Sequence, residues 1–227
     1  MTTTYAYHRV TASSRQWRGV ADGFAAGPAL GEAGAVLYGI WRSQIGRPRD
    51  ELSVITAWPD RVTAELAEAA LTASVGAISG ISTEIMRPTL RPIAPDRPIR
   101  QGNYAFRWFS TPGGNWDEFL DLCAAAWPGF ESAYDSQVIG LWRIGDERTG
   151  GAVEEATGAG ISSGIRSLLL TRRPDLAMWE RSKLPQGRAE EIVRETLSRR
   201  YDLCDWTVVN TSTLLTAEDM VDTARWA

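Results

Sequence analysis

An internal repeat constrains the fold of this 227-residue chain more than any other feature of its sequence. Residues 5–11 (Tyr-Ala-Tyr-His-Arg-Val-Thr) match residues 104–110 (Tyr-Ala-Phe-Arg-Trp-Phe-Ser) at an offset of 99, which also carries Trp17 onto Trp116. Three further matches follow in the same order: 36–42 with 137–143, 53–60 with 168–175, and 88–90 with 212–214. Because chance is a poor account of four ordered matches whose offsets only increase, the sequence predicts two copies of one structural unit.

Each copy is predicted to contain a strand, a helix, two strands, a helix and a strand. The first matched segments alternate in the manner of strands, and a tryptophan opens the helix that follows each of them. In the second copy this helix carries apolar residues at steps of three and four: Phe119, Leu122, Cys123, Ala126 and Trp127. The second helices are expected at 60–74 and 189–199, with an additional helical segment at 174–183. This order is that of the ferredoxin-like fold.

The predicted organisation is a first repeat over residues 1–91, a proline-rich linker over 92–102 and a second repeat over 103–227. A four-stranded sheet with both helices on one face leaves its other face bare, which exposes apolar surface. Two such sheets in one chain can cover each other. We therefore expect an α+β fold in which two fused ferredoxin-like repeats pack their antiparallel sheets face to face into an α/β barrel with a cavity inside. A glycine-rich insertion at 145–164, predicted to be a flexible loop, explains the larger offset of the third match.

Composition and motif content exclude several classes of protein. A formal net charge of −4 gives no electrostatic case for nucleic-acid binding, and no apolar run approaches the roughly 18 residues that a membrane span needs. Cys123 and Cys204 lack CxxC spacing, and the single histidine, His8, excludes centres built from several imidazoles, so no metal site is expected. Without a signal-peptide pattern in its first residues, the protein is expected to be cytoplasmic.

Three segments carry a family resemblance: 5–8 (Tyr-Ala-Tyr-His) before the first helix, 39–46 (Gly-Ile-Trp-Arg-Ser-Gln-Ile-Gly) in a hairpin, and 51–60 in the strand that follows. They resemble the NIPSNAP family of the dimeric α/β-barrel superfamily, although this strand ends in Thr56-Ala57-Trp58 where the family has Trp-x-Tyr. The resemblance implies a tandem repeat, a fused pseudo-dimer whose interior holds a small, often aromatic molecule. Relatives in the superfamily include cofactor-free quinol monooxygenases, polyketide cyclases, lactone isomerases and haem enzymes such as chlorite dismutases.

Alternation along the strands separates two faces and nominates catalytic residues. Because a helix-covered face is expected to be apolar, the matched aromatic residues of the first strands are placed under the helices: Tyr5, Tyr7, Tyr104 and Phe106. His8 and Arg107 then point into the barrel. His8 titrates near neutrality and would act as a general base, while Arg107 would hold the resulting oxyanion. The alternatives are a hydrogen-bonded polar residue in a strand for His8 and an ion pair with a neighbouring acid for Arg107.

Six further residues are candidates for substrate binding. Trp41 and Trp142 occupy matched positions and either stack on a flat ligand or belong to the packed core. The other four are expected to face inward from the third strands: Thr56, Trp58, Thr171 and Arg173. For the two threonines the alternative is simple β-propensity. The chain has ten tryptophans, more than a core of this size needs, which favours an aromatic-lined cavity or groove.

The leading functional hypothesis is a small-molecule enzyme of natural-product biosynthesis that binds an aromatic or polyketide-like substrate in the barrel interior. Its acid–base chemistry would need no organic cofactor, as in a cyclase, an isomerase or a cofactor-independent monooxygenase. The alternatives are a non-catalytic small-molecule-binding or scaffold protein of the NIPSNAP type, and a haem-binding barrel with His8 as axial ligand. The expected partner is a small aromatic substrate, with no nucleic acid or membrane, and the expected assembly is a monomeric pseudo-dimer or a homodimer.

Overall fold

A computed structural model of the chain describes residues 3–73, 75–145 and 164–219. The chain divides into two compact units. Unit 1 comprises Met1–Met86, Ala94–Tyr104 and Asn210–Ala227, and unit 2 comprises Arg87–Ile93 and Ala105–Val209. The glycine-rich insertion predicted at 145–164 lies, apart from its two end residues, outside the described part of the chain. The division predicted from the sequence, with a linker at 92–102, stays a prediction.

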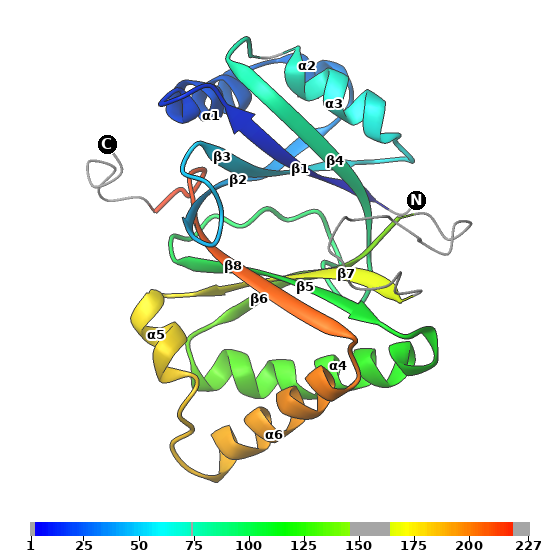
Figure 1. The fold of residues 1–227 in the computed structure, drawn as a ribbon, viewed down its shortest axis with the longest axis vertical. Helices are drawn as coiled ribbons and strands as arrows, with labels where there is room; N and C mark the ends of the chain where they lie inside the picture. Colours follow the sequence, from blue (N-terminus) through cyan, green and yellow to red (C-terminus); the bar gives the residue numbers. More distant parts are fainter. Residues whose placement is uncertain (1–2, 74, 146–163, 220–227) are drawn as a thin grey trace. The chain divides into compact units, whose positions relative to one another are not determined.

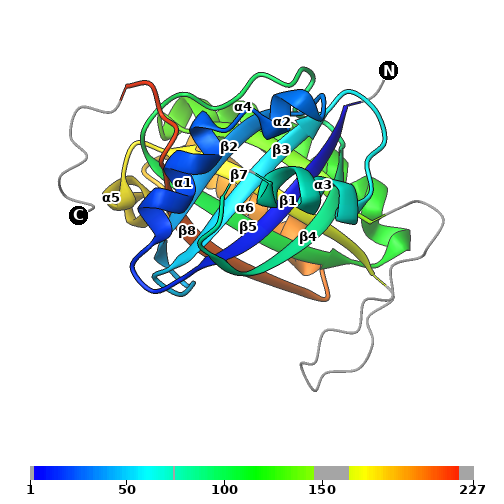
Figure 2. The ribbon, with the colours of Figure 1, turned by 90° about the horizontal axis from the view of Figure 1, so that it is seen from above.

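Unit 1 is built on an antiparallel sheet with helices on one face. Its elements are β1 (Thr4–Ala12), α1 (Trp17–Ala26), α2 (Ala29–Glu32), β2 (Val36–Ile45), β3 (Glu51–Trp58), α3 (Ala64–Thr72) and β4 (Ile78–Pro88). β1 lies between β3 and β4, and β2 pairs with the other edge of β3. The Thr63 side chain caps α3 by accepting a hydrogen bond from the Leu66 amide. Both ribbon views show α1, α2 and α3 on the same side of these strands (Figure 1, Figure 2).

Unit 2 contains most of a second set of elements, in which the strands and the two main helices follow the same order; the first two residues of β5 and the last five of β8 belong to unit 1. These elements are β5 (Asn103–Thr111), the short 3-10 helix η1 (Gly113–Asn115), α4 (Trp116–Ala133), β6 (Gln137–Ile144), β7 (Ile165–Arg173), α5 (Leu176–Arg181), α6 (Arg188–Asp202) and β8 (Trp206–Leu214). β6 and β7 pair antiparallel, and α4 and α6 lie side by side (Figure 1). Asp175 caps α5 by accepting a hydrogen bond from the Met178 amide.

The eight strands form one antiparallel sheet that closes on itself in the order β1-β3-β2-β8-β5-β7-β6-β4. Because the ring is closed, it can be divided into β4-β1-β3-β2 and β8-β5-β7-β6. Each of these sets has the strand order of a ferredoxin-like βαββαβ unit. The predicted fold class, an α+β barrel of two such units, is therefore confirmed. The predicted second helices are present with shifted ends, and α3 begins at Ala64 rather than at residue 60 because Thr63 caps it. No helix in the described residues is long and apolar enough to cross a membrane.

The apolar core of unit 1 lies between its sheet and its helices. The strands contribute Ala6, Val10, Ile40, Leu52, Val54 and Trp58, and the helices contribute Trp17, Val20, Phe24, Ala67 and Leu71. Since strand side chains alternate between faces, His8 and Thr56 share this helix-covered face with Trp58, and Tyr5 and Tyr7 lie on the opposite one. The orientation predicted for these residues, with the tyrosines under the helices, is wrong.

The same correction applies to unit 2. Its core contains Phe109, Val138, Leu141 and Leu169 from the strands and Phe119, Cys123, Trp127, Phe130 and Val193 from the helices. By alternation, Arg107, Thr171 and Arg173 face the helices, whereas Phe106 lies on the other face. Both faces carry buried apolar side chains, since Tyr5, Tyr7, Tyr104 and Phe106 are all nearly inaccessible to solvent. Apolar character therefore does not identify the helix-covered face of this sheet.

Trp41 and Trp142 have a structural role that their glycine neighbours make visible. Both indoles are fully buried on the face opposite the helices, and the strand register shifts just before Gly39 and again just before Gly140. A Cβ atom on Gly39 would lie 2.5 Å from Cη2 of Trp41, and one on Gly140 would lie 2.4 Å from Cη2 of Trp142. Glycine is thus required because the indole two residues further on occupies the space of its side chain.

Candidate functional site

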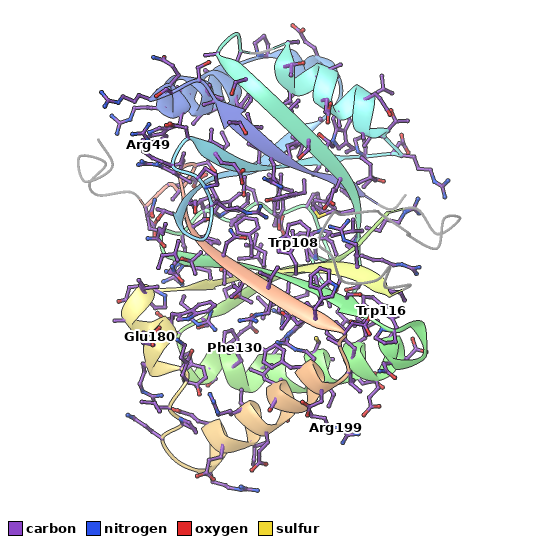
Figure 3. All side chains as sticks on the ribbon, in the orientation of Figure 1. Arg49, Trp108, Trp116, Phe130, Glu180 and Arg199 are labelled. Carbon is purple, nitrogen blue, oxygen red and sulfur yellow. The ribbon has the colours of Figure 1, made fainter. Side chains whose placement is uncertain are left out.

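A pocket of about 280 Å³ lies in unit 2, between strands β5, β6 and β7 and helices α4, α5 and α6. Its walls include five aromatic and five cationic side chains: Trp127, Phe130, Tyr134, Trp179, Tyr201, Arg107, Arg173, Lys183, Arg194 and Arg200. Within the described part of the chain, no aspartate or glutamate lines it. Figure 3 labels Phe130, whose ring lies between α4 and the strands. The pocket is slightly smaller than the roughly 300–1,000 Å³ of drug-sized sites, which suits a small ligand of a few fused rings.

Of the four arginines that line the pocket, Arg107, Arg173 and Arg200 reach it from three different elements. Arg107 comes from β5 and Arg173 from the end of β7, where alternation turns both toward the helices. Arg200 comes from α6, where it follows Val193 and Leu197 at helical steps of four and three along the side that faces the core. The local folding rules that build a strand and an amphipathic helix thus bring three guanidinium groups into one cavity.

Arg173 is held by aromatic rings rather than by an acid. Its guanidinium carbon lies 4.9 Å from the ring centroid of Phe130 and 4.4 Å from that of Trp179. Its Nη1 donates a 3.4 Å hydrogen bond to Oγ1 of Thr171, and its Nε has no hydrogen-bond partner among the described residues. Burial lowers the pKa of Arg173 to about 10, and the positive charge of Arg107 acts in the same direction. The side chain therefore stays charged at neutral pH.

Arg107 and Arg200 lie on the same aromatic ring. Their guanidinium carbons are 5.1 Å and 4.8 Å from the ring centroid of Tyr201. Arg107 donates a 3.4 Å hydrogen bond to Oγ1 of Thr207, and burial lowers the pKa of this arginine. Arg200 is only 2% exposed, its guanidinium donates a hydrogen bond to Sγ of Cys123 at 3.7 Å, and its Nε is unpaired among the described residues. Neither arginine forms an ion pair with a carboxylate in the described chain.

Helix α5 borders the pocket with Trp179 and is fixed by an ion pair. Arg181 donates two hydrogen bonds to Glu190, at 2.7 Å and 2.8 Å, and the Gln186 amide and Tyr134 hydroxyl donate two more. The bonds from Arg181 and from the Gln186 amide lower the pKa of Glu190 to about 2. This carboxylate lies behind the Tyr134 wall of the pocket, and its oxygens are already engaged.

His8 lies in unit 1 and does not reach the pocket. Its side chain is 0% exposed. Its Nδ1 is hydrogen-bonded to Oγ1 of Thr83 at 2.7 Å, and its Nε2 to Oγ1 of Thr56 at 3.0 Å. Nε1 of Trp58 also donates to Oγ1 of Thr56, at 2.9 Å. Burial lowers the pKa of His8 to about 3, so the imidazole is neutral at physiological pH. These surroundings match the alternative in which His8 is a hydrogen-bonded polar residue of a strand.

The offsets of the sequence repeat relate this cluster to the pocket. The predicted repeat pairs His8, Thr56, Trp58 and Thr83 of unit 1 with Arg107, Thr171, Arg173 and Thr207 of unit 2, at offsets of 99, 115, 115 and 124. In each unit the first residue is hydrogen-bonded to the fourth, and the third donates to the second. The unit 1 cluster is neutral and buried, whereas its unit 2 counterpart carries two positive charges and lines a pocket.

The structure therefore divides the sequence-predicted site residues into three groups. Arg107, Thr171 and Arg173 come together in the unit 2 pocket. His8, Thr56 and Trp58 form the closed cluster of unit 1, and Trp41 and Trp142 lie on the opposite sheet face. Trp127, Arg200 and Tyr201 are among the lining residues that sequence reasoning missed. Arg200 could have been found from the sequence, because burying a charged side chain in the apolar stripe of a helix is costly unless another group there interacts with the charge.

The described residues do not provide a metal or haem site of the kinds considered. They contain no group of three or more His, Cys, Asp or Glu side chains that could hold a metal ion. A haem ligand needs a free ring nitrogen that faces a cavity, whereas both nitrogens of His8 are hydrogen-bonded and its ring is inaccessible. His8 therefore does not fit the role of an axial ligand.

The strand order and the two ferredoxin-like units define an α+β barrel. No protein-family model matches the sequence, and no curated protein matches it. Among solved structures the fold is similar to that of a candidate monooxygenase from Lactobacillus acidophilus, with a TM-score of 0.56, 8% identity, and 96% of this chain and 98% of that chain covered. An anthrone oxidase-like protein gives a TM-score of 0.55 at 13% identity, with 95% and 92% covered. A candidate chlorite dismutase gives 0.51 at 16%, with 95% of each chain covered. At these identities the likeness concerns the fold, and NIPSNAP membership and the tandem repeat stay predictions.

Proposed function

We propose that the protein is a small-molecule enzyme that binds an aromatic or polyketide-like substrate in the unit 2 pocket and acts on an anionic form of it. The observation that carries this proposal is the combination of aromatic walls with three guanidinium groups that lack carboxylate partners among the described residues. Flat rings pack on aromatic side chains, and guanidinium groups stabilise the negative charge that develops when such a substrate loses a proton.

The pocket supports chemistry that starts from a substrate oxyanion. A phenol or enol beside Arg107 and Arg173 would ionise more readily, because its conjugate base gains charge-assisted hydrogen bonds. The lining residues in the described chain include no histidine or carboxylate to take the proton, so electrostatic stabilisation would supply most of the driving force. An electron-rich phenolate or enolate is the species that cyclises, isomerises or reacts with dioxygen. Because this anion reacts directly, the proposed chemistry requires no organic cofactor.

Oxygenation is the reaction that the structural comparisons favour. Two proteins of the same fold are named as a candidate monooxygenase and as anthrone oxidase-like. Anthrone is a three-ring ketone whose enol form is a phenol, which is the kind of substrate that the pocket chemistry suits. Its oxidation by dioxygen gives anthraquinone and one water molecule, and dioxygen is the oxidant.

The test is turnover of anthrone by the full-length protein, followed by oxygen uptake and by the absorbance of anthraquinone. We expect Arg107→Gln to lower kcat/KM by about 100-fold, the typical effect of removing one oxyanion donor. His8→Gln is the matched control and is expected to keep its turnover, because His8 lies outside the pocket. Equal losses in the two variants, or turnover that survives Arg107→Gln, would contradict the proposal.

A non-catalytic binding protein is the second candidate function. One observation favours it: the described lining residues offer no histidine, aspartate or glutamate as a general base. Both functions predict that anthrone binds in the pocket, and only the enzyme predicts that it is consumed. Saturable binding to the wild type without oxygen uptake or product would select the binding protein.

A further inference from the structure

We propose that the unit 2 pocket selects aromatic ligands that carry a carboxylate, with Arg173 as the residue that receives this group. This inference rests on the proposed function for the location of the site and adds the chemical class of its ligand. It is argued from three features of the pocket: its uncompensated charge, its unpaired donors and its contrast with the matched cluster of unit 1.

Arg107, Arg173 and Arg200 have no carboxylate partner among the described residues, whereas Lys183 pairs with Glu180 at 2.7 Å. Five cationic side chains and no carboxylate line it within the described chain. Arg200 is 2% exposed, and its guanidinium contacts the Cys123 thiol and the rings of Phe109 and Tyr201. Withdrawing charged groups from water is costly unless an opposite charge accompanies them. A ligand with a negative charge would offset this cost, whereas a neutral ligand of the same shape would displace water and leave the charges unpaired.

Glu190, a carboxylate bonded to the Tyr134 wall of the pocket, is already engaged by other groups. Glu190 accepts hydrogen bonds from the Tyr134 hydroxyl, at the wall of the pocket, and from Arg181, which it pairs with at 2.7 Å. The Gln186 amide donates a further 2.8 Å bond to the same carboxylate. Glu190 is therefore satisfied by residues of α4, α5 and the turn before α6, and it does not serve the pocket arginines.

Unpaired donors indicate where an acceptor would bind. Among the described residues, Nε of Arg173, Nε of Arg200 and the indole Nε1 of Trp127 have no hydrogen-bond partner although they are withdrawn from solvent. A planar guanidinium with a free Nε edge matches the two oxygens of a carboxylate. Phe130 and Trp179 flank the guanidinium of Arg173 and limit its movement. The cavity thus offers the guanidinium of Arg173, which is flanked by aromatic rings and can bind a carboxylate, and the indole N–H of Trp127, which can donate another hydrogen bond.

The contrast with unit 1 argues that the charge serves a ligand rather than the fold. At the matched positions unit 1 has His8, held neutral by burial, and Trp58, and its hydrogen bonds are complete. The same strand framework therefore does not require arginine at these positions. Arginine occurs in the unit where the cluster lines a pocket, which is where a charged ligand has room to bind.

The experiment compares 2-naphthoate with its uncharged isostere 2-naphthamide, by calorimetric titration of the full-length protein. We expect naphthoate to bind at least about tenfold more tightly than naphthamide. Arg173→Gln is expected to lose at least about tenfold in affinity for naphthoate and to keep its affinity for naphthamide within about twofold. The control Arg188→Gln removes the same charge from an exposed position of α6, where Arg188 pairs with Glu191 and Glu195, and is expected to leave both affinities unchanged.

Each outcome separates this inference from the proposed function. The carboxylate preference would be overturned if the two probes bound with equal affinity. It would also be overturned if Arg188→Gln lost as much naphthoate affinity as Arg173→Gln. Either result would leave an aromatic-binding pocket in place. Absence of binding by either probe, together with absence of anthrone turnover, would overturn both. If circular dichroism shows that Arg173→Gln does not fold, Arg107→Gln replaces it, with the same tenfold loss expected for naphthoate alone.

Discussion

His8 and Arg107 occupy matched positions in the sequence repeat, yet their surroundings give them opposite charge states. His8 is enclosed by two threonine hydroxyls and burial holds it neutral, whereas Arg107 lies on the Tyr201 ring in the pocket and remains charged. The sequence pattern placed this pair of positions on the inner face of the barrel. It misplaced them because the tyrosine and phenylalanine residues on the opposite face are as deeply buried as the helix-covered core, so both faces look apolar.

The depressed pKa of His8 predicts a specific pH dependence of stability. Its pKa is about 3 in the folded protein against 6.5 in the unfolded chain, so protonation favours unfolding. The stabilisation is fully present above pH 6.5 and is lost as the pH falls below that value. Between pH 7 and pH 5 the wild type is expected to lose about 2 kcal/mol more of its unfolding free energy than His8→Gln.

Urea unfolding of both proteins at pH 7 and pH 5 measures this difference. The variant serves as the control for all other titrating groups, since aspartates and glutamates contribute equally to both proteins. Parallel loss of stability in the wild type and in His8→Gln would show that the imidazole is not protonated on unfolding, and that it is not the neutral buried group described above.

At the scale of elements, helices were easier to predict than the faces they cover. The spacing of Phe119, Cys123 and Trp127 predicted α4 because the apolar stripe of a long helix is unambiguous. The short helix α5 was also expected, within 174–183, and Asp175 caps its start. What could not be predicted is that α5 borders a pocket, because this depends on the ion pair between Arg181 and Glu190, nine residues apart across a turn.

That ion pair predicts a local effect of Glu190→Gln. Without the carboxylate, the two bonds from Arg181 lose their charge, and α5 is expected to exchange its backbone amides several-fold faster in hydrogen exchange. Naphthoate affinity should fall by a few-fold, because Trp179 is carried by this helix. The control Glu195→Gln removes an exposed carboxylate of α6 and is expected to change neither quantity. Unchanged exchange in Glu190→Gln would show that the ion pair does not hold α5.

The pKa of Glu190 adds a second check on the same element. The pKa of Glu190 is lowered from the usual 4.5 to about 2. The carboxylate therefore stays ionised when the pH falls below 4.5, and it loses its charge only as the pH falls through about 2. We therefore expect α5 to keep the same protection, after correction for intrinsic exchange, between pH 7 and pH 4. Loss of protection near pH 4.5 would indicate an ordinary carboxylate without the Arg181 bonds.

At the scale of the whole molecule, the repeat in the sequence predicted the fold class because strand order follows from element order in a βαββαβ unit. It also anticipated Arg107, Thr171 and Arg173, which the structure brings into one pocket. It did not anticipate Arg200, which lies one residue beyond the helix predicted at 189–199, or Trp127, which was placed in the apolar stripe of the helix that is α4. The cluster of unit 1 is neutral and closed, whereas that of unit 2 is charged and lines a pocket. This difference depends on packing between elements, which the sequence of a single strand does not determine.

The central claim is that the helix-covered pocket of unit 2 is the ligand site, and a crystal structure with 6-bromo-2-naphthoate tests it most directly. The anomalous signal of bromine locates the ring without reference to any expected pose. The account predicts one bromine peak among Trp127, Phe130 and Tyr201, with the carboxylate within hydrogen-bond distance of Arg173. A bromine peak on the opposite face of the sheet beside Trp41 or Trp142, or an empty unit 2 pocket at saturating ligand, would contradict it.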